Sequence, residues 1–149
     1  MNRKDAVAAL ADVRETQEKL AGRASWPLHR HAMFGMAEGL IVAGLAQPNA
    51  LAVAMIVIAM VLLIVCVAAD RRRDGMFVSG WQPGASRPLT IGITLFVLAM
   101  AAASAMSRDV EHVGVLGYMF GVLTAVVCTG ASLRWEKIYR NDLLGKSEE

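Results

Sequence analysis

Charged residues are scarce in this sequence. Only 19% of its residues are Asp, Glu, Lys or Arg, against about 25% in an average soluble domain. Aromatic residues make up 6%, although 56% of the residues are hydrophobic. The apolar content is therefore mostly Ala, Val, Leu, Ile and Met, which suits helices that face lipid or one another. These shortages predict an all-α integral membrane protein, with a four-helix bundle in the membrane.

Other shortages remove whole classes of function. The net charge is only +2 and no nucleic-acid-binding motif occurs, so we expect no nucleic-acid partner. The two cysteines, Cys66 and Cys128, lie in apolar runs without a CxxC pair or the Cys/His spacing of a zinc site. No Ser/His/Asp, metal or phosphate motif is present. We therefore expect no enzyme, no metal and no cofactor.

Four apolar stretches are long enough to be membrane spans. The second of them, LAVAMIVIAMVLLIVCVAA, contains no charge, and at ~1.5 Å per residue it crosses a ~30 Å hydrocarbon core. Trp26 and Pro27 favour a helix start before the first stretch, and Pro48 breaks it. The first thirty residues lack the apolar core of a cleavable signal, so we expect insertion through internal spans. The predicted spans are about 28–46, 51–69, 89–106 and 113–133.

The segments outside the spans are polar. Residues 1–25 alternate apolar and charged positions at helical spacing, which predicts a short amphipathic cytoplasmic helix that is too polar to span. Residues 70–88 form the predicted cytoplasmic loop, and residues 134–149 form a tail that is helical at its start. The transmembrane domain covers residues 26–133.

The basic residues predict one orientation. With four spans, Arg108 is the single residue among the fifteen Lys and Arg that falls on the far side of the membrane. The side that is rich in Lys and Arg is the cytoplasmic one in membrane proteins. We therefore expect a multi-pass protein of a bacterial-type inner (plasma) membrane, with both termini in the cytoplasm.

Small residues recur every fourth position in the first and last spans. Glycine and alanine at this spacing let two helix backbones approach closely, although glycine is also simply common in membrane helices. Pairing of the two stripes would place the first span beside the last. The stripes are Gly35, Gly39 and Ala43 in the first span, and Gly117, Gly121 and Ala125 in the last.

Glu38 is the acidic residue near the middle of the first span. It lies beside Gly39, so we expect it to face the bundle, and an unpaired carboxylate at this depth is costly when ionised, which predicts a protonated side chain. Thr124 in the last span is at matching depth and is the predicted hydrogen-bond partner. Two interpretations remain: a polar contact between helices, or a site that exchanges a proton or binds a cation.

The segment GMAEGLIVAG around Glu38 is superficially similar to the first-span segment of the small multidrug resistance transporters. That family has four spans and an essential glutamate in the first. The similarity covers residues 35–44. This chain departs from the family's pattern, because it is longer, has a predicted cytoplasmic helix before the first span, and lacks the aromatic-rich pattern of the family's later spans.

Basic and aromatic residues gather in the central loop and the tail. Arginines near an anionic leaflet and aromatic rings at headgroup depth are typical of membrane anchors. The alternative is a docking surface for an anionic lipid headgroup or a cytosolic protein. The residues concerned are Arg71, Arg72, Arg73, Phe77, Trp81, Arg87, Trp135 and Tyr139.

These features favour a small accessory, scaffold or regulatory membrane protein that binds a protein or lipid partner through its cytoplasmic face. The alternative is a proton-coupled transporter or channel that uses Glu38, in which a homo-oligomer would supply the path that one small chain cannot enclose. His29 and His31, at the cytoplasmic start of the first span, are interpreted as polar anchors at the interface.

Overall fold

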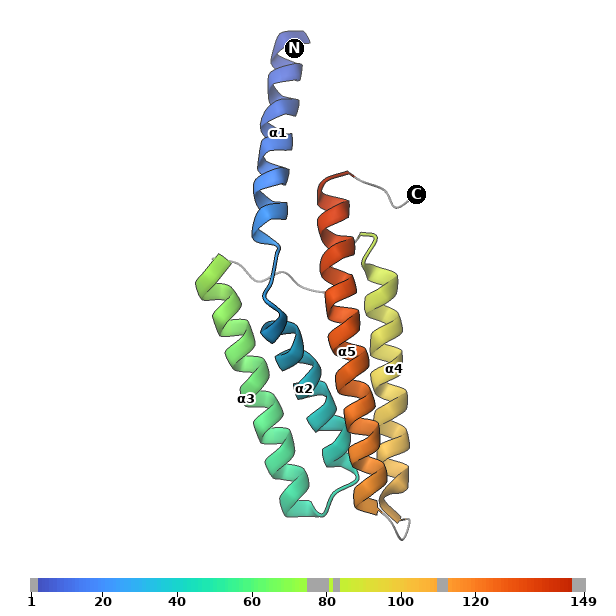
Figure 1. The fold of residues 1–149 in the computed structure, drawn as a ribbon. Helices are drawn as coiled ribbons and strands as arrows, with labels where there is room; N and C mark the ends of the chain where they lie inside the picture. Colours follow the sequence, from blue (N-terminus) through green and yellow to red (C-terminus); the bar gives the residue numbers. More distant parts are fainter. Residues whose placement is uncertain (1–2, 75–80, 82–83, 110–112, 146–149) are drawn as a thin grey trace.

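The structure, a computed structural model, describes residues 3–74, 81, 84–109 and 113–145. Over these residues the protein is all-helical, as predicted, and contains no strand. The helices lie side by side along most of their length, apart from the first (Figure 1). They are α1 (Arg3–Arg23), α2 (Leu28–Leu45), α3 (Asn49–Asp74), α4 (Arg87–Met106), the short 3₁₀ turn η1 (Ser107–Asp109) and α5 (Val113–Leu143).

Proline and glycine mark several helix ends. Pro27 has an extended backbone immediately before α2, and Pro88 occupies the first turn of α4, where its missing N–H costs no helical hydrogen bond. Gly145 adopts a left-handed φ of 63° just beyond α5, a conformation that glycine adopts without a steric penalty. The proline and glycine positions therefore explain where these helices begin and end.

Two helices extend beyond the predicted spans. α3 continues through the arginine triplet to Asp74, so Arg71–Arg73 lie in its last turn and not in a loop. α5 continues without a break from Val113 to Leu143, so the start of the tail is an extension of the last helix. Both extensions carry charged residues past the apolar part of the bundle.

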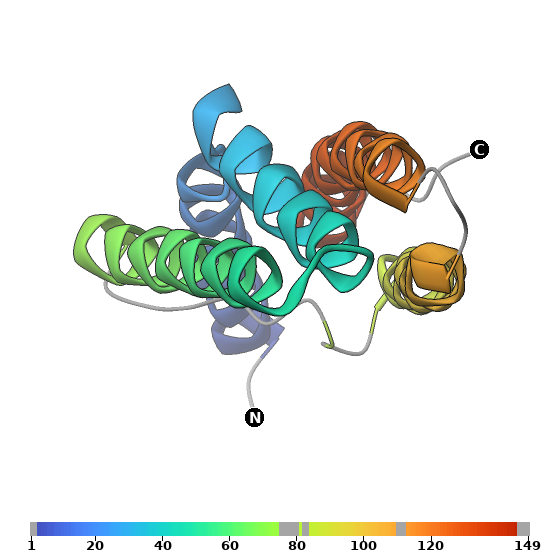
Figure 2. The ribbon, with the colours of Figure 1, turned by 90° about the horizontal axis from the view of Figure 1, so that it is seen from below.

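α2 lies at the centre of the bundle. Its most extensive contact is with α5, and α3 packs on another side of it. α4 contacts both α5 and α2. The view along the helices shows α2 between α3 and α5 (Figure 2). Successive helices from α2 to α5 run in alternating directions (Figure 1).

α1 projects beyond one end of the bundle (Figure 1). Its main contact is with the end of α5. The apolar residues Val7, Leu10 and Val13 are each more than half exposed. The amphipathic stripe of α1 is therefore not covered by the rest of the described chain.

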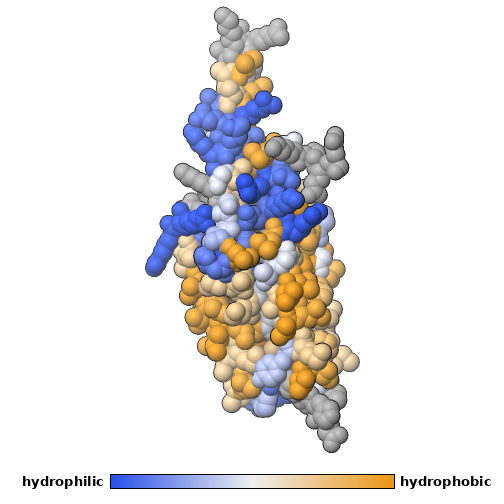
Figure 3. Space-filling view, viewed as in Figure 1, coloured by the Kyte–Doolittle hydropathy of each residue, from blue (hydrophilic) through white to orange (hydrophobic). Residues whose placement is uncertain are grey.

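Among the described residues, three helices are long and apolar enough to cross a membrane: Asn49–Arg73, Arg87–Met106 and Val115–Leu143. Their large apolar side chains are widely exposed, for example Val57 on α3 and Val126 on α5. Space-filling shows apolar residues over the lower part of the molecule and polar residues at the end that bears α1 (Figure 3). The chain is thus a multi-pass helical membrane protein.

α2 falls outside that group of three helices. Its eighteen residues include Arg30, two histidines and Glu38, which lower its hydropathy. Yet α2 has many buried positions, including His31, Gly39 and Val42. A helix whose surface is covered by protein needs less apolar character than one that faces lipid.

Candidate functional site

The structure brings the two stripes of small residues face to face. A Cβ atom added to Gly39 would lie 2.6 Å from the carbonyl oxygen of Gly121 and 2.8 Å from the Cβ atom of Ala125. One added to Gly121 would lie 2.6 Å from the Cβ atom of Ala43. These distances are shorter than real Cβ contacts, so the backbones of α2 and α5 touch only because glycine is present.

The same close approach continues along the seam between α2 and α5. A Cβ atom on Gly35 would collide with Ala125 and Thr129, and one on Gly117 would lie 2.5 Å from the Cβ atom of Ala46. Residue numbers along α2 therefore increase as those of their contact partners along α5 decrease, which is the pattern of an antiparallel pair. This seam fixes which residues of the two helices meet at either end.

The predicted hydrogen bond between Glu38 and Thr124 does not form. The Thr124 side chain is completely buried, and its hydroxyl donates to the carbonyl oxygen of Phe120 on its own helix, at 2.8 Å. A threonine inside a helix reaches the carbonyl four residues earlier without help from another element. Glu38 is partly buried and has no hydrogen-bond or ion-pair partner among the described residues.

His31 is a polar residue with no exposed surface. Its Nδ1 atom lies 2.8 Å from the Oγ atom of Ser132, and its Nε2 atom lies 2.8 Å from Oε2 of Glu136. The backbone N–H of Trp26 donates to the same Glu136 oxygen at 3.2 Å. His31 is therefore not a surface anchor, as the sequence suggested, but a polar bridge between α2 and α5.

The hydrogen-bond directions follow from the chemistry of these groups. An ionised carboxylate only accepts, so the Nε2–H of His31 donates to Glu136. With the imidazole neutral, Nδ1 accepts from the Ser132 hydroxyl. The order serine, histidine, acid resembles that of a hydrolase triad. However, Ser132 lies within α5, where the backbone N–H groups are used in helical hydrogen bonds and offer no oxyanion hole. The arrangement suits bridging between helices.

A second polar bridge joins α2 to α3. The Nε atom of Arg30 donates to both carboxylate oxygens of Asp70 at 2.9 Å, and its Nη2 atom lies 2.7 Å from Oδ2. The two side chains are only 19% and 10% exposed. The guanidinium carbon of Arg30 also lies 4.4 Å from the centre of the Trp26 ring. α2 is thus tied to both of its neighbours at the same end of the bundle.

Aromatic rings extend this end of the bundle along α5. The rings of Trp26 and Trp135 are 6.1 Å apart, and those of Trp135 and Tyr139 are stacked at 5.0 Å. Of the two α5 residues that the sequence grouped with the docking residues, Trp135 therefore packs against Trp26, just before α2, and Tyr139 stacks on Trp135. We call the interlinked residues at this end the polar end cluster: Trp26, Arg30, His31, Asp70, Ser132, Trp135, Glu136, Tyr139 and Arg140.

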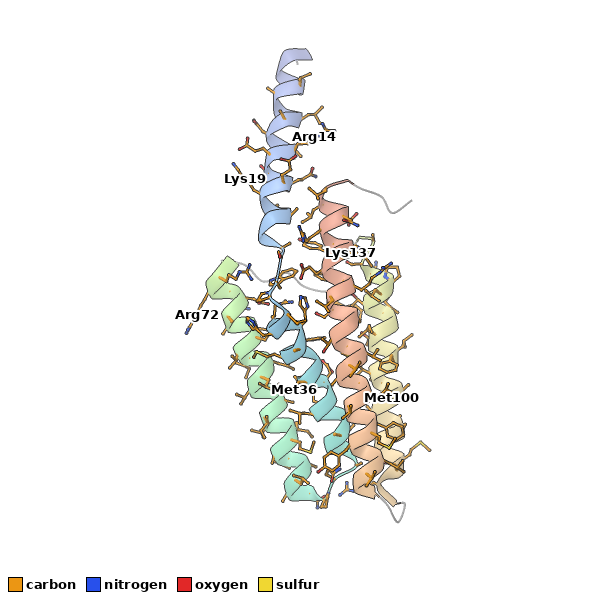
Figure 4. The ribbon with its side chains drawn as sticks, in the orientation of Figure 1. Arg14, Lys19, Met36, Arg72, Met100 and Lys137 are labelled. Atoms are coloured by element: carbon orange, nitrogen blue, oxygen red, sulfur yellow. The ribbon has the colours of Figure 1, made fainter. Side chains whose placement is uncertain are left out.

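The other predicted docking residues are spread over this end. Arg71, Arg72 and Arg73 are exposed at the end of α3, and Arg73 donates to the carbonyl oxygen of Ser25 at 2.7 Å. Figure 4 shows the Arg72 side chain pointing away from the bundle, and it places Lys137 on α5 at the same end. Trp81 and Arg87 are also exposed, and Phe77 lies outside the described residues.

Sequence reasoning missed most of the polar end cluster, although one signal was available. His31 lies four residues before Gly35 and so continues the stripe of small residues by one helical turn. On α5, Ser132 and Glu136 lie seven and eleven residues beyond Ala125 of the opposing stripe, or about two and three turns. Extending the predicted seam toward this end of the bundle would have placed these side chains near His31.

Comparison with protein-family models, curated proteins and solved structures finds no match to this chain. Among the described residues, no group of three or more His, Cys, Asp or Glu side chains is arranged to hold a metal ion. The polar end cluster and the surface around it are therefore the features of this chain that bear on its function.

Proposed function

We propose that this protein is a four-span inner-membrane protein with both termini in the cytoplasm. In this proposal it is an accessory, scaffold or regulatory component, not an enzyme, that binds a protein or lipid partner through its cytoplasmic face. The observation that carries the proposal is the segregation of polar groups. The polar end cluster and the exposed arginines of α3 share one end of the bundle, while the apolar surface lies below (Figure 3).

The position of α2 supports a fourth span. α2 packs against α3 and α5, which are both apolar enough to cross a membrane. A helix held between two crossing helices occupies the same depth as they do. Its polar residues are covered: His31 by α5 and Arg30 by Asp70 of α3. This cover offsets the low hydropathy of α2.

The distribution of arginine supports the orientation. The end that carries the polar end cluster also carries Arg71–Arg73, Arg87, Arg134 and Lys137, whereas Arg108 lies at the opposite end beside Asn49, with Nη2 2.6 Å from Oδ1. Retention of basic residues in the cytoplasm makes the first end cytoplasmic. On the same rule we base the proposal of a bacterial-type inner membrane.

Single cysteines introduced at the helix ends will test the topology. In a variant with Cys66 and Cys128 replaced by alanine, cysteines at Ser25 and Ala85 should resist a membrane-impermeant maleimide on intact cells. A cysteine at Ala50 should react. All three residues are exposed in the structure. If α2 does not cross, Ser25 and Ala50 will be labelled from the same side, which would refute the fourth span.

The partner surface is proposed to be the exposed cationic face at the end of α3. Arg71 and Arg72 are exposed there, and Trp81 is 60% exposed. Exposed cationic and aromatic groups suit an acidic protein surface or an anionic headgroup. By contrast, Glu38 lines neither of two surface cavities that lie at helix ends.

Glu38→Gln and a double Arg71→Gln, Arg72→Gln variant will separate the two functional hypotheses. For an accessory protein, the arginine variant should retain about tenfold less protein or phospholipid partner after purification in mild detergent, while Glu38→Gln should retain it fully. Quantitative mass spectrometry of the purified samples measures both. If the unmodified protein purifies with neither protein nor lipid, the accessory function is wrong.

A proton-coupled transporter or channel remains the second candidate. The observation in its favour is that Glu38 has no partner among the described residues, which leaves its carboxyl group available to a proton, a cation or a second copy. In liposomes, Glu38→Gln should then abolish pH-dependent transport. Equal fluxes for the two proteins would exclude this role for Glu38.

A further inference from the structure

A cavity of about 550 Å³ opens beside the polar end cluster, between the start of α2 and the end of α5. The geometry points to a binding site for the phosphate group of an anionic phospholipid in this cavity. The inference deepens the proposed function, on which it rests, by naming a ligand class and a location apart from the α3 arginines. The residues that carry it are Trp26, Leu28, Leu133, Lys137 and Arg140, all of which line the cavity.

Two of the residues that line this cavity carry unpaired hydrogen-bond donors. Trp26 is only 8% exposed, and its indole Nε1–H has no acceptor among the described residues. The Nε–H of Arg140 is also buried, with no acceptor in the described part of the chain. Buried donors without acceptors are rare in proteins because each is costly. A ligand that supplies several oxygen acceptors would satisfy them.

The charge of the cavity favours an anion. Its charged lining residues are Lys137, Arg140 and Glu136, whose formal charges sum to +1. The Oε2 atom of Glu136 already accepts hydrogen bonds from Trp26 and His31, and its Oε1 atom lies 3.9 Å from Nη1 of Arg140. The carboxylate is thus committed within the protein, and Lys137 remains exposed. A phosphodiester, with one negative charge, matches this balance.

The depth of the cavity identifies the phosphate as that of a lipid. Leu28, the first residue of α2, lies ten residues from Glu38 near the middle of the span, or about 15 Å along a helical rise of ~1.5 Å per residue, which equals about half of the hydrocarbon core. The cavity therefore lies at headgroup level. Leu28 and Leu133, which are 66% and 41% exposed, form apolar walls on its membrane side. An acyl chain would cover these walls, whereas a soluble phosphate would leave them open.

Thermal unfolding in neutral detergent will test the site, with phosphatidylglycerol as the probe and phosphatidylcholine as the neutral control. Phosphatidylglycerol should raise the unfolding temperature of the unmodified protein, and phosphatidylcholine should not. Lys137→Gln should weaken the apparent affinity for phosphatidylglycerol about tenfold, because a charge-assisted contact is lost. Trp26→Phe, which removes the N–H but keeps a ring, should weaken it to a similar extent.

Arg14→Gln is the matched control, because it removes the same charge from an exposed residue of α1, outside both the cavity and the α3 surface. It should bind phosphatidylglycerol as the unmodified protein does. Equal weakening by Arg14→Gln and Lys137→Gln would show nonspecific attraction and overturn the site, as would unchanged affinity in Lys137→Gln. Equal stabilisation by glycerol 3-phosphate would overturn the lipid assignment. If Trp26→Phe does not fold, the comparison of Lys137→Gln with Arg14→Gln still tests the site.

These results are independent of the test of the accessory function. The double Arg71→Gln, Arg72→Gln variant reports on the α3 surface, whereas Lys137→Gln reports on the cavity. Loss of partner from the α3 variant with unchanged phosphatidylglycerol affinity in Lys137→Gln would refute the lipid site alone. A lipid response that depends on Lys137, in a protein that purifies with no other protein, would leave the lipid site intact and refute a protein partner.

Discussion

Replacement of Gly121 by leucine is expected to separate α2 from α5. Even the first added carbon would lie 2.6 Å from the Cβ atom of Ala43 and 2.7 Å from the carbonyl oxygen of Gly39. Backbone cannot yield as a flexible side chain does, so we expect a loss of about 3 kcal/mol or more in the free energy of unfolding. For a chain of this length that corresponds to a fall of about 6–12 °C in the unfolding temperature, measured in detergent.

Gly130→Leu provides a control on the same helix. It adds the same side chain to α5, but no atom lies within 4 Å of a Cβ atom at this position. The position is exposed, so leucine there should leave the unfolding temperature unchanged or raise it slightly through its better helix propensity. If the two leucine variants unfold at the same temperature, close backbone packing does not hold α2 against α5.

Glu136→Ala is expected to give the second large effect. Removal of the carboxylate leaves the Nε2–H of His31 and the backbone N–H of Trp26 without their acceptor, in a region where His31 is completely buried. Each buried unsatisfied donor costs about 1–3 kcal/mol. We therefore expect a loss of about 3 kcal/mol in the free energy of unfolding, measured by thermal or chemical denaturation in detergent.

Glu15→Ala is the corresponding control on α1. Glu15 pairs with Lys19 one turn later, but both side chains are largely exposed, and an exposed pair of this kind contributes little. Its loss should leave the unfolding temperature unchanged within error. A similar small effect for Glu136→Ala would mean that water replaces the carboxylate and that the polar end cluster does not stabilise the bundle.

Local patterns were sufficient to predict the helices. Apolar side chains need no hydrogen-bond partner in lipid. Long apolar runs bounded by Pro48, the arginine triplet and the turns therefore indicate helices of membrane-spanning length. The spacing of glycine in the first and last spans indicated which helix faces allow another backbone to approach closely. Such features depend only on residues close together in the chain.

The polar end cluster could not be read in the same way. Arg30 and Asp70, taken singly, are typical of solvated residues at the end of a span, and their pairing depends on where α3 packs against α2. In the sequence Glu136 is one of several charges in a tail at the membrane interface, and only the structure shows that His31 lies opposite it. The Glu38–Thr124 contact was predicted from depth alone, which does not fix how two side chains are turned, and the Thr124 hydroxyl donates to a carbonyl of its own helix.

The central seam joins the first and last helices of the bundle, and this has a consequence for biosynthesis. His31 and Glu136 are 105 residues apart, so at about 5–20 residues per second a ribosome completes the second about 5–20 s after the first. During that interval α2 has α3 and α4 beside it but not the surface that covers His31. A chain that stops short of α5 would expose this histidine and the glycine stripe, and quality-control proteases could thereby distinguish it from the finished protein.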